Sequence, residues 1–166
     1  MMDETRMIDF AEALAAGCGP LLERILAGLT ALPGVMDATL LAVAPDRQSV
    51  ERIASSNPAR FPVGGGEALD REDPWCQRIM GEKQPVLAND SAGLRLYLTE
   101  AADIEAAGYG ASGSFPIVIG GEVAGTVNVL APSGYFTART VANVTAHLPL
   151  AALGCLLHGR EADARP

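Results

Sequence analysis

Four side chains that carry a hydroxyl or an amide recur at every second position along two apolar stretches in the last third of the chain. They are Ser112, Ser114, Thr126 and Asn128. Residues two apart in a β-strand share a face of the sheet. Each pair can therefore orient a small molecule by hydrogen bonds from one sheet face. The alternative for Asn128 is that its amide only satisfies neighbouring backbone, and the sequence does not determine which face the two serines use.

A second set of candidate contacts lies in the segment that precedes these stretches. It comprises Trp75, Asp90, Arg95, Tyr97 and Tyr109. A mostly apolar hollow with a few converging polar groups suits small-molecule recognition, and Arg95 can clamp a carboxylate. Each has a structural alternative: Trp75 as part of the core, Asp90 as the cap of a turn, and Arg95 as an exposed side chain.

Catalytic chemistry has little support in this sequence. Cys18, Cys76 and Cys155 show neither a disulfide framework nor metal-ligand spacing. Cys76 falls in the first turn of a predicted helix, where backbone N–H groups favour a thiolate. His147 and His158 both fall on the predicted last helix. The sequence therefore identifies no catalytic residue, no metal site and no cofactor.

Two apolar runs, 115–119 and 123–130, flank Gly120 and Gly121, and they predict a tight β-hairpin. Both runs are too apolar for a sheet that exposes one face to solvent, so we expect other parts of the chain to cover both faces of the sheet. Alternation divides the second strand into two sets of side chains. Val123, Gly125, Val127 and Val129 should face the terminal helices, and Ala124, Thr126, Asn128 and Leu130 should face the opposite cover.

Elements earlier and later in the chain can position these residues. Apolar spacing of three and four over 7–32, interrupted at Gly17 to Pro20, predicts two consecutive helices or one kinked helix. Residues 35–44, 49–55 and 85–87 read as strands, and residues 57–72 as a loop. Asp73 and Pro74 begin a helix that reaches Met80. Thr99 caps a helix through Ala107, and Thr137 caps a last helix to about residue 157 that Pro149 kinks or breaks. This order predicts an α+β fold in which the terminal helices cover one face of an antiparallel sheet and residues 58–109 cover the other.

Composition and charge limit the partners. The chain has 166 residues, which suits a single domain. Twelve Lys and Arg against twenty Asp and Glu give a net charge of −8. This balance argues against binding to nucleic acid or to an anionic membrane. No apolar run is expected to reach membrane-spanning length and the first residues are acidic, so we expect a cytoplasmic protein.

Several short motifs resemble those of the GAF domain, a ligand-sensing relative of the PAS fold. They are Trp75 with Ile79, Lys83-Gln84-Pro85-Val86, Asp90, Ala107-Gly108, Phe115-Pro116-Ile117, Gly121-Glu122-Val123, Gly125-Thr126-Val127-Asn128 and Phe136. The resemblance spans about 35–157. It implies an antiparallel sheet of five or six strands, a helical face that often dimerises, and a cavity under the middle segment.

The resemblance does not decide the ligand. Members of the family bind cyclic nucleotides, bilins, haem, small anions or metabolites, and a few are enzymes. The Cys-His pair of the bilin binders and the Asn-Lys-x-Asp pattern of the cyclic-nucleotide binders are not found here. Free methionine sulfoxide reductases use a second cysteine within disulfide reach, and only Cys76 is expected near the cavity.

These observations lead to one expectation with two alternatives. We expect residues 1–166 to form a single, stand-alone, non-catalytic GAF-type sensor, with an N-terminal helical part at about 4–32, a sheet-and-lid core at about 35–132 and a C-terminal helix at about 137–158. It would bind a small metabolite or anion and form a homodimer through its terminal helices. The alternatives are a thiol-dependent enzyme that uses Cys76, or an interaction module whose own side chains fill the cavity.

Overall fold

The computed structural model describes residues 4–164, so the first and last residues of the expected domain lie outside the described part. Its centre is a six-stranded antiparallel sheet with the strand order β3-β2-β1-β6-β5-β4. The strands are β1 (Asp37–Val43), β2 (Ser49–Ser55), β3 (Gly66–Ala68), β4 (Val86–Ala88), β5 (Ala111–Ile119) and β6 (Glu122–Ala131). The predicted α+β class and antiparallel sheet are confirmed.

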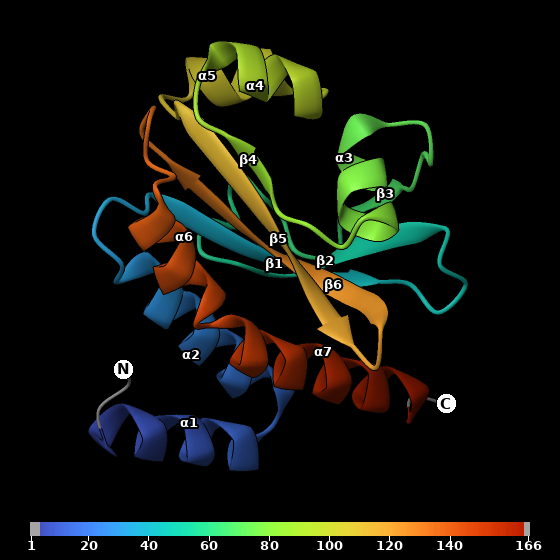
Figure 1. Ribbon diagram of the computed structural model, residues 1–166. Coiled ribbons are helices and arrows are strands. Elements are labelled where there is room, and N and C mark those ends of the chain that lie inside the picture. Colours follow the sequence, from blue (N-terminus) through green and yellow to red (C-terminus); the bar gives the residue numbers. More distant parts are fainter. Residues whose placement is uncertain (1–3, 165–166) are drawn as a thin grey trace.

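Helices cover both faces of this sheet. The helices are α1 (Glu4–Ala16), α2 (Cys18–Thr30), α3 (Pro74–Cys76), the π-helical turn η1 (Gln77–Gly81), α4 (Ser91–Tyr97), α5 (Ala101–Ala106), α6 (Ala138–Thr145) and α7 (Leu148–Asp163). Figure 1 shows α1, α2, α6 and α7 on one side of the sheet and α3, α4 and α5 on the other. We call the segment from β3 to α5, residues 66–106, the lid.

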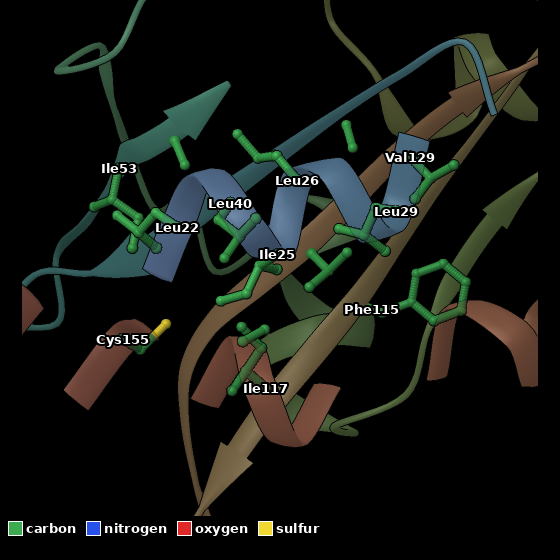
Figure 2. Packing of buried hydrophobic residues seen from close by; sticks show 14 of the residues in the cluster. Leu22, Ile25, Leu26, Leu29, Leu40, Ile53, Phe115, Ile117, Val129 and Cys155 are labelled. Carbon is green, nitrogen blue, oxygen red and sulfur yellow. The ribbon is translucent and has the colours of Figure 1, made fainter. Parts of the chain in front are cut away.

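The apolar face of α2 forms the centre of the main core. A break at Gly17, whose φ is +121°, separates α1 from α2, as the sequence predicts. One side of α2 is buried, and Ile25 and Leu29 have no exposed surface. Figure 2 shows these side chains directed toward β-strand residues such as Leu40 and Val129. Burial of each such side chain contributes about 1.5–3 kcal/mol, so α2 holds the sheet firmly from this side.

The C-terminal helical segment bends after α6. The hydroxyl groups of Thr137 and Thr140 form a capping box that begins α6. The chain then turns at Ala146 and His147, and Pro149 lies in the first turn of α7, where a missing N–H is harmless. α7 contacts β5, β6 and α2. The predicted break near Pro149 is thus confirmed.

The segment Ala138–Asp163 is long and apolar enough to cross a membrane by length and composition. This finding corrects the expectation that no part of the chain reaches that length. It is a weak indication, because core helices of soluble proteins meet the same criteria, and here the segment is bent into two helices. Only 22% of its most apolar window is buried, so much of its apolar surface faces outward.

A β-bulge in β6 reverses the side-chain alternation near the hairpin turn. The register shifts between Ile117 and Val118, which leaves Ala124 without a partner on β5. Val123 therefore packs under the lid, in a buried cluster with Ile79, whereas Ala124 packs on the terminal-helix side. The prediction for Val123 and Ala124 is wrong, because one inserted residue shifts the period-two pattern.

The lid contains more structure than the sequence predicts. Asp73 accepts hydrogen bonds from the backbone of Trp75 and Cys76, which confirms the predicted helix start. Two elements were not predicted: β3, which lies in an expected loop, and α4. The last lid helix begins at Ala101 rather than after a Thr99 cap.

Gly125 of β6 lies where strand β1 and helix α7 both come close to the backbone. A Cβ atom at this position would overlap the carbonyl oxygen of Leu41 and lie 3.0 Å from Sγ of Cys155. We expect Gly125→Ala to lower the free energy of unfolding by about 3 kcal/mol, because a backbone oxygen on a paired strand cannot move aside. Urea denaturation followed by circular dichroism measures this.

Gly159 provides the control, since it lies in α7 and a Cβ there would meet no atom within 4 Å. Gly159→Ala should leave the stability unchanged or raise it by up to about 1 kcal/mol, as helix propensity dictates. Equal denaturation midpoints for the two variants would contradict the close contact at Gly125.

Candidate functional site

A cavity of about 320 Å³ lies between the sheet and the lid. This volume is within the range of small-molecule sites. The sheet contributes Asp37, Ala38, Thr39, Leu41, Val50, Arg52, Ser112, Ser114, Asn128 and Leu130. The lid and the loops beside it contribute Phe61, Glu67, Ala68, Leu69, Asp70, Asp73, Trp75, Cys76, Tyr97, Leu98, Thr99, Glu100 and Ile104. The cavity therefore lies between the sheet and the middle segment, and some of the predicted contact residues line it.

Three polar side chains form a row across the centre of the cavity floor. Asn128 on β6 is paired with Thr39 on β1 and with Ser114 on β5, so the three side chains share one face of neighbouring strands. The amide nitrogen of Asn128 donates to the hydroxyl of Thr39 at 3.3 Å. This bond directs the amide group along the floor and leaves its carbonyl oxygen available as an acceptor.

Trp75 forms one wall of the cavity and is anchored to the same row. Its indole N–H donates to the hydroxyl of Ser114 at 2.9 Å. The Asp73 cap fixes the backbone of this residue from the other side. Trp75 is half-buried and lines the open volume, so it does not fill the cavity in the way that the alternative for this residue proposed.

Ser112 is a buried polar residue that faces the cavity. The residue is 7% exposed and lies two positions before Ser114 on β5. Within residues 4–164 its hydroxyl has no hydrogen-bond partner. The hydroxyl faces the open volume of the cavity, so a bound molecule can supply the hydrogen bond that the protein does not.

Five of the nine predicted contact residues come together in this cavity. They are Trp75, Tyr97, Ser112, Ser114 and Asn128. The other four are not among its lining residues. Asp90 caps α4 by accepting from the N–H of Gly93 at 2.8 Å, which was the structural alternative for this residue. Arg95 is exposed and pairs with Glu105 at 3.4 Å, so it does not point toward a ligand in the cavity.

Tyr109 and Thr126 are buried outside the cavity. The hydroxyl of Tyr109 donates to the carboxylate of Asp37, and burial together with this carboxylate raises the pKa of the tyrosine. Thr126 faces the lid as predicted, but the apolar cluster around Ile79 and Val123 occupies that end of the sheet. The cavity therefore ends before it reaches Thr126.

Sequence reasoning missed the contribution of β1, β2 and the edge of the sheet. Alternation in β1 places Asp37, Thr39 and Leu41 on the cavity face, and this signal was present in the sequence. Glu67 and Glu100 had no comparable signal, because they reach the cavity from a loop-like segment and from a helix start.

The Cys76 thiol lines the cavity but is poorly suited to nucleophilic chemistry. It is 4% exposed, and burial, followed by the nearby Asp73 carboxylate, raises its pKa. The prediction that the helix start favours a thiolate is therefore wrong, since Asp73 already occupies the N–H group of Cys76. Cys18 and Cys155 lie in the core on the other side of the sheet, as do the helices that carry both histidines.

The two serines of β5 allow a matched test of the Trp75 anchor. We expect Ser114→Ala to lower the free energy of unfolding by about 1 kcal/mol or more, because a half-buried indole N–H loses its acceptor. The emission of Trp75, the single tryptophan of the chain, should shift at the same time. Denaturation followed by fluorescence measures both quantities.

Ser112→Ala is the control, because it removes a hydroxyl of the same strand face that has no partner. Its effect should remain within about 0.5 kcal/mol. If Ser112→Ala destabilised the protein as strongly as Ser114→Ala, the assigned hydrogen bond would not explain the position of Trp75.

Comparisons with known proteins agree with this architecture. The structure resembles residues 122 to 287 of a methyl-accepting chemotaxis protein, with a TM-score of 0.68, 19% sequence identity and coverage of 92% of this chain and 97% of that one. It also resembles the GAF domain of an Acinetobacter phosphoenolpyruvate-protein phosphotransferase, with a TM-score of 0.67, 13% identity and coverage of 97% and 99%. The GAF domain of a two-component sensor histidine kinase from Bacillus halodurans gives a TM-score of 0.68, 9% identity and coverage of 89% and 97%.

These identities establish a shared fold and nothing finer. A search of curated proteins finds no match to the chain. The family model of the GAF domain matches residues 20–153, which include the whole sheet, the lid, α6, most of α2 and the beginning of α7. Because this match covers most of the chain and the fold agrees with it, the chain belongs to the GAF domain family, a type of sensor and regulatory domain.

Proposed function

We propose that this chain is a single, non-catalytic sensor domain that binds a small metabolite in the cavity between the sheet and the lid. The observation that carries the proposal is a cavity of about 320 Å³ into which the Ser112 hydroxyl projects without a hydrogen-bond partner among the described residues. The polar row of Thr39, Ser114 and Asn128 adds groups that can orient a ligand. We place the domain in the cytoplasm as part of the same proposal.

The lining supports binding more than the two alternatives. The open volume beside Trp75 favours a ligand over an interaction module whose own side chains fill the space. A thiol enzyme would need an accessible, acidic thiol with a second cysteine nearby, whereas Cys76 is buried with a raised pKa. Arg95, the residue expected to bind an anion, does not line the cavity and pairs with Glu105. We therefore propose a small metabolite as the ligand and no longer an anion.

Sensing requires that the ligand bind two conformations with different affinity. The lid is the element that can differ between them, because it contacts the sheet through two separate apolar clusters with the cavity between them. Two of the similar structures come from a chemotaxis protein and a sensor histidine kinase, in which such a domain is part of a signalling protein.

A ligand screen with a blocked variant tests the binding proposal. Any compound that occupies the cavity at 100 times its dissociation constant should stabilise the fold by about 2.7 kcal/mol, which raises the melting temperature. We expect Ala68→Trp to abolish this shift, because Ala68 is an exposed lining residue on edge strand β3 and indole would fill the opening. Thermal melting by circular dichroism against a metabolite panel measures it.

Ala102→Trp is the matched control, since Ala102 is an exposed residue of α5 that does not line the cavity. This variant should respond to ligands like the unmodified protein. A panel without any stabilising compound, or shifts that persist in Ala68→Trp, would overturn a ligand site in this cavity.

The signalling unit in this proposal is a homodimer joined through α1 and α7. The outward side of α7 carries Leu153 and Leu156, which are 39% and 51% exposed. Met7 and Ile8 of α1 are exposed to a similar degree. Apolar side chains gathered on the terminal helices are typical of a surface that a second copy covers.

A charged residue on α7 tests the dimer. We expect Leu156→Glu to shift the protein to monomer in sedimentation experiments, because a carboxylate would have to be buried in the interface. Leu96→Glu is the control, since Leu96 of lid helix α4 is 58% exposed and lies away from the terminal helices. A protein that sediments as a monomer before any substitution would contradict the proposal.

A further inference from the structure

The charge of the cavity lining is strongly one-sided. Five of the lining residues carry a carboxylate, and one carries a guanidinium. The acidic residues are Asp37, Glu67, Asp70, Asp73 and Glu100, and the basic residue is Arg52. A hollow lined in this way repels anions and concentrates cations, because low-dielectric walls focus the field of the charges around it.

The hydrogen bonds that these carboxylates accept come from neutral donors. Asp37 accepts from the hydroxyls of Tyr109 and Ser56 and from the amide of Asn57. Asp73 and Asp70 accept from backbone N–H groups in their own turns. Among residues 4–164, no salt bridge includes any of the five. Their negative charge is therefore not paired directly with a cation in the described part of the chain.

Arg52 offsets this charge only in part, because it is one cation among five carboxylates and forms a salt bridge with none of them. Its Nη1 atom donates to the carbonyl oxygen of Pro62 at 3.1 Å, and its guanidinium lies 5.8 Å from the ring centre of Phe61. Burial, and after it the neighbouring Glu100 carboxylate, raises the pKa of Glu67 despite the opposing influence of Arg52. We call the edge of the cavity at Glu67 and Glu100 the rim. The two carboxylates at the rim repel one another, and a cation between them would relieve that repulsion.

The distribution of acidic groups favours an organic cation over a metal ion. In the described part of the chain, no three His, Cys, Asp or Glu side chains come close enough to hold a metal. The charge is instead spread around a hollow that also has aromatic walls, formed by Trp75 and Tyr97. Aromatic faces together with carboxylates are the groups that recognise an ammonium ion carried on an apolar body.

The floor gives the second, independent indication of a ligand. Ser112 is more than nine-tenths buried, faces the cavity and has no partner for its hydroxyl within the described residues. The carbonyl oxygen of Asn128, on the same floor, accepts no hydrogen bond from the described residues and is a further acceptor for a ligand. A molecule that reaches from the acidic rim to the floor can satisfy both ends of the site.

We infer that the cavity selects a small organic ammonium ion, with the protonated amine at the rim near Glu67 and Glu100 and the apolar body against Trp75 and Tyr97. This inference rests on the proposed function and names the chemical class of its ligand.

Three probes that share a phenylethyl body test the charge preference. They are 2-phenylethylamine, 2-phenylethanol and 3-phenylpropionate, titrated calorimetrically into the full chain at low salt. We expect the amine to bind at least about tenfold more tightly than the alcohol, with no detectable binding of the carboxylate. Added salt should lower the affinity for the amine and leave the affinity for the alcohol unchanged, since salt screens only the interaction of the charged probe.

Variants at the rim locate the ammonium. Each of two variants, Glu67→Gln and Glu100→Gln, should raise the dissociation constant of the amine about threefold or more and leave that of the alcohol unchanged. Glu51→Gln is the matched control, because Glu51 is an exposed residue of β2 that does not line the cavity, and it changes the net charge equally. Equal weakening by Glu51→Gln would assign the effect to the overall charge and overturn the rim site.

The outcomes separate this inference from the proposal beneath it. A neutral or anionic compound that stabilises the protein while no amine binds would overturn the inference and leave the sensor proposal standing. Absence of binding by every probe and every compound of the panel would overturn both.

Discussion

The contact between the sheet and the helices α2 and α7 determines where this molecule can be hollow. On that face the side chains of Ile25, Leu29, Val127 and Val129 are fully buried. The backbones of β1 and β6 approach so closely at Gly125 that no side chain fits there. A face packed in this way has the density of a protein interior and offers no space for a ligand. The cavity lies on the opposite face, under the lid.

The lid meets that opposite face at its two ends. At one end Leu94 and Ile104 of α4 and α5 pack with Leu130, and at the other end Ile79 packs with Val123. The cavity lies between these two clusters, and the indole of Trp75 spans part of the distance. The lid position is therefore set by side chains of the sheet itself, which links the content of the cavity to the arrangement of the lid.

Much of this fold follows from local physical rules, and the exceptions have specific causes. The Asp73 cap, the double-glycine turn and the amphipathic α2 each depend on a few neighbouring residues, so the sequence predicts them. The bulge at Ala124 depends on pairing with another strand and is not visible in β6 alone. The acidic rim was missed because β3 has three residues without apolar character, and its position depends on pairing with β2. For the same reason the sequence predicted the polar floor of β5 and β6 better than the charges above it.

The two outermost strands, β3 and β4, consist of three residues each. An outer strand exposes one row of unpaired N–H and C=O groups, and a long row is a template on which further chains add as strands. Here each of these rows is short, and Pro116, which has no N–H group, lies in the part of β5 that extends beyond β4. Both features disfavour the addition of a further strand. We therefore expect any self-association of this domain to use side chains rather than main-chain hydrogen bonds.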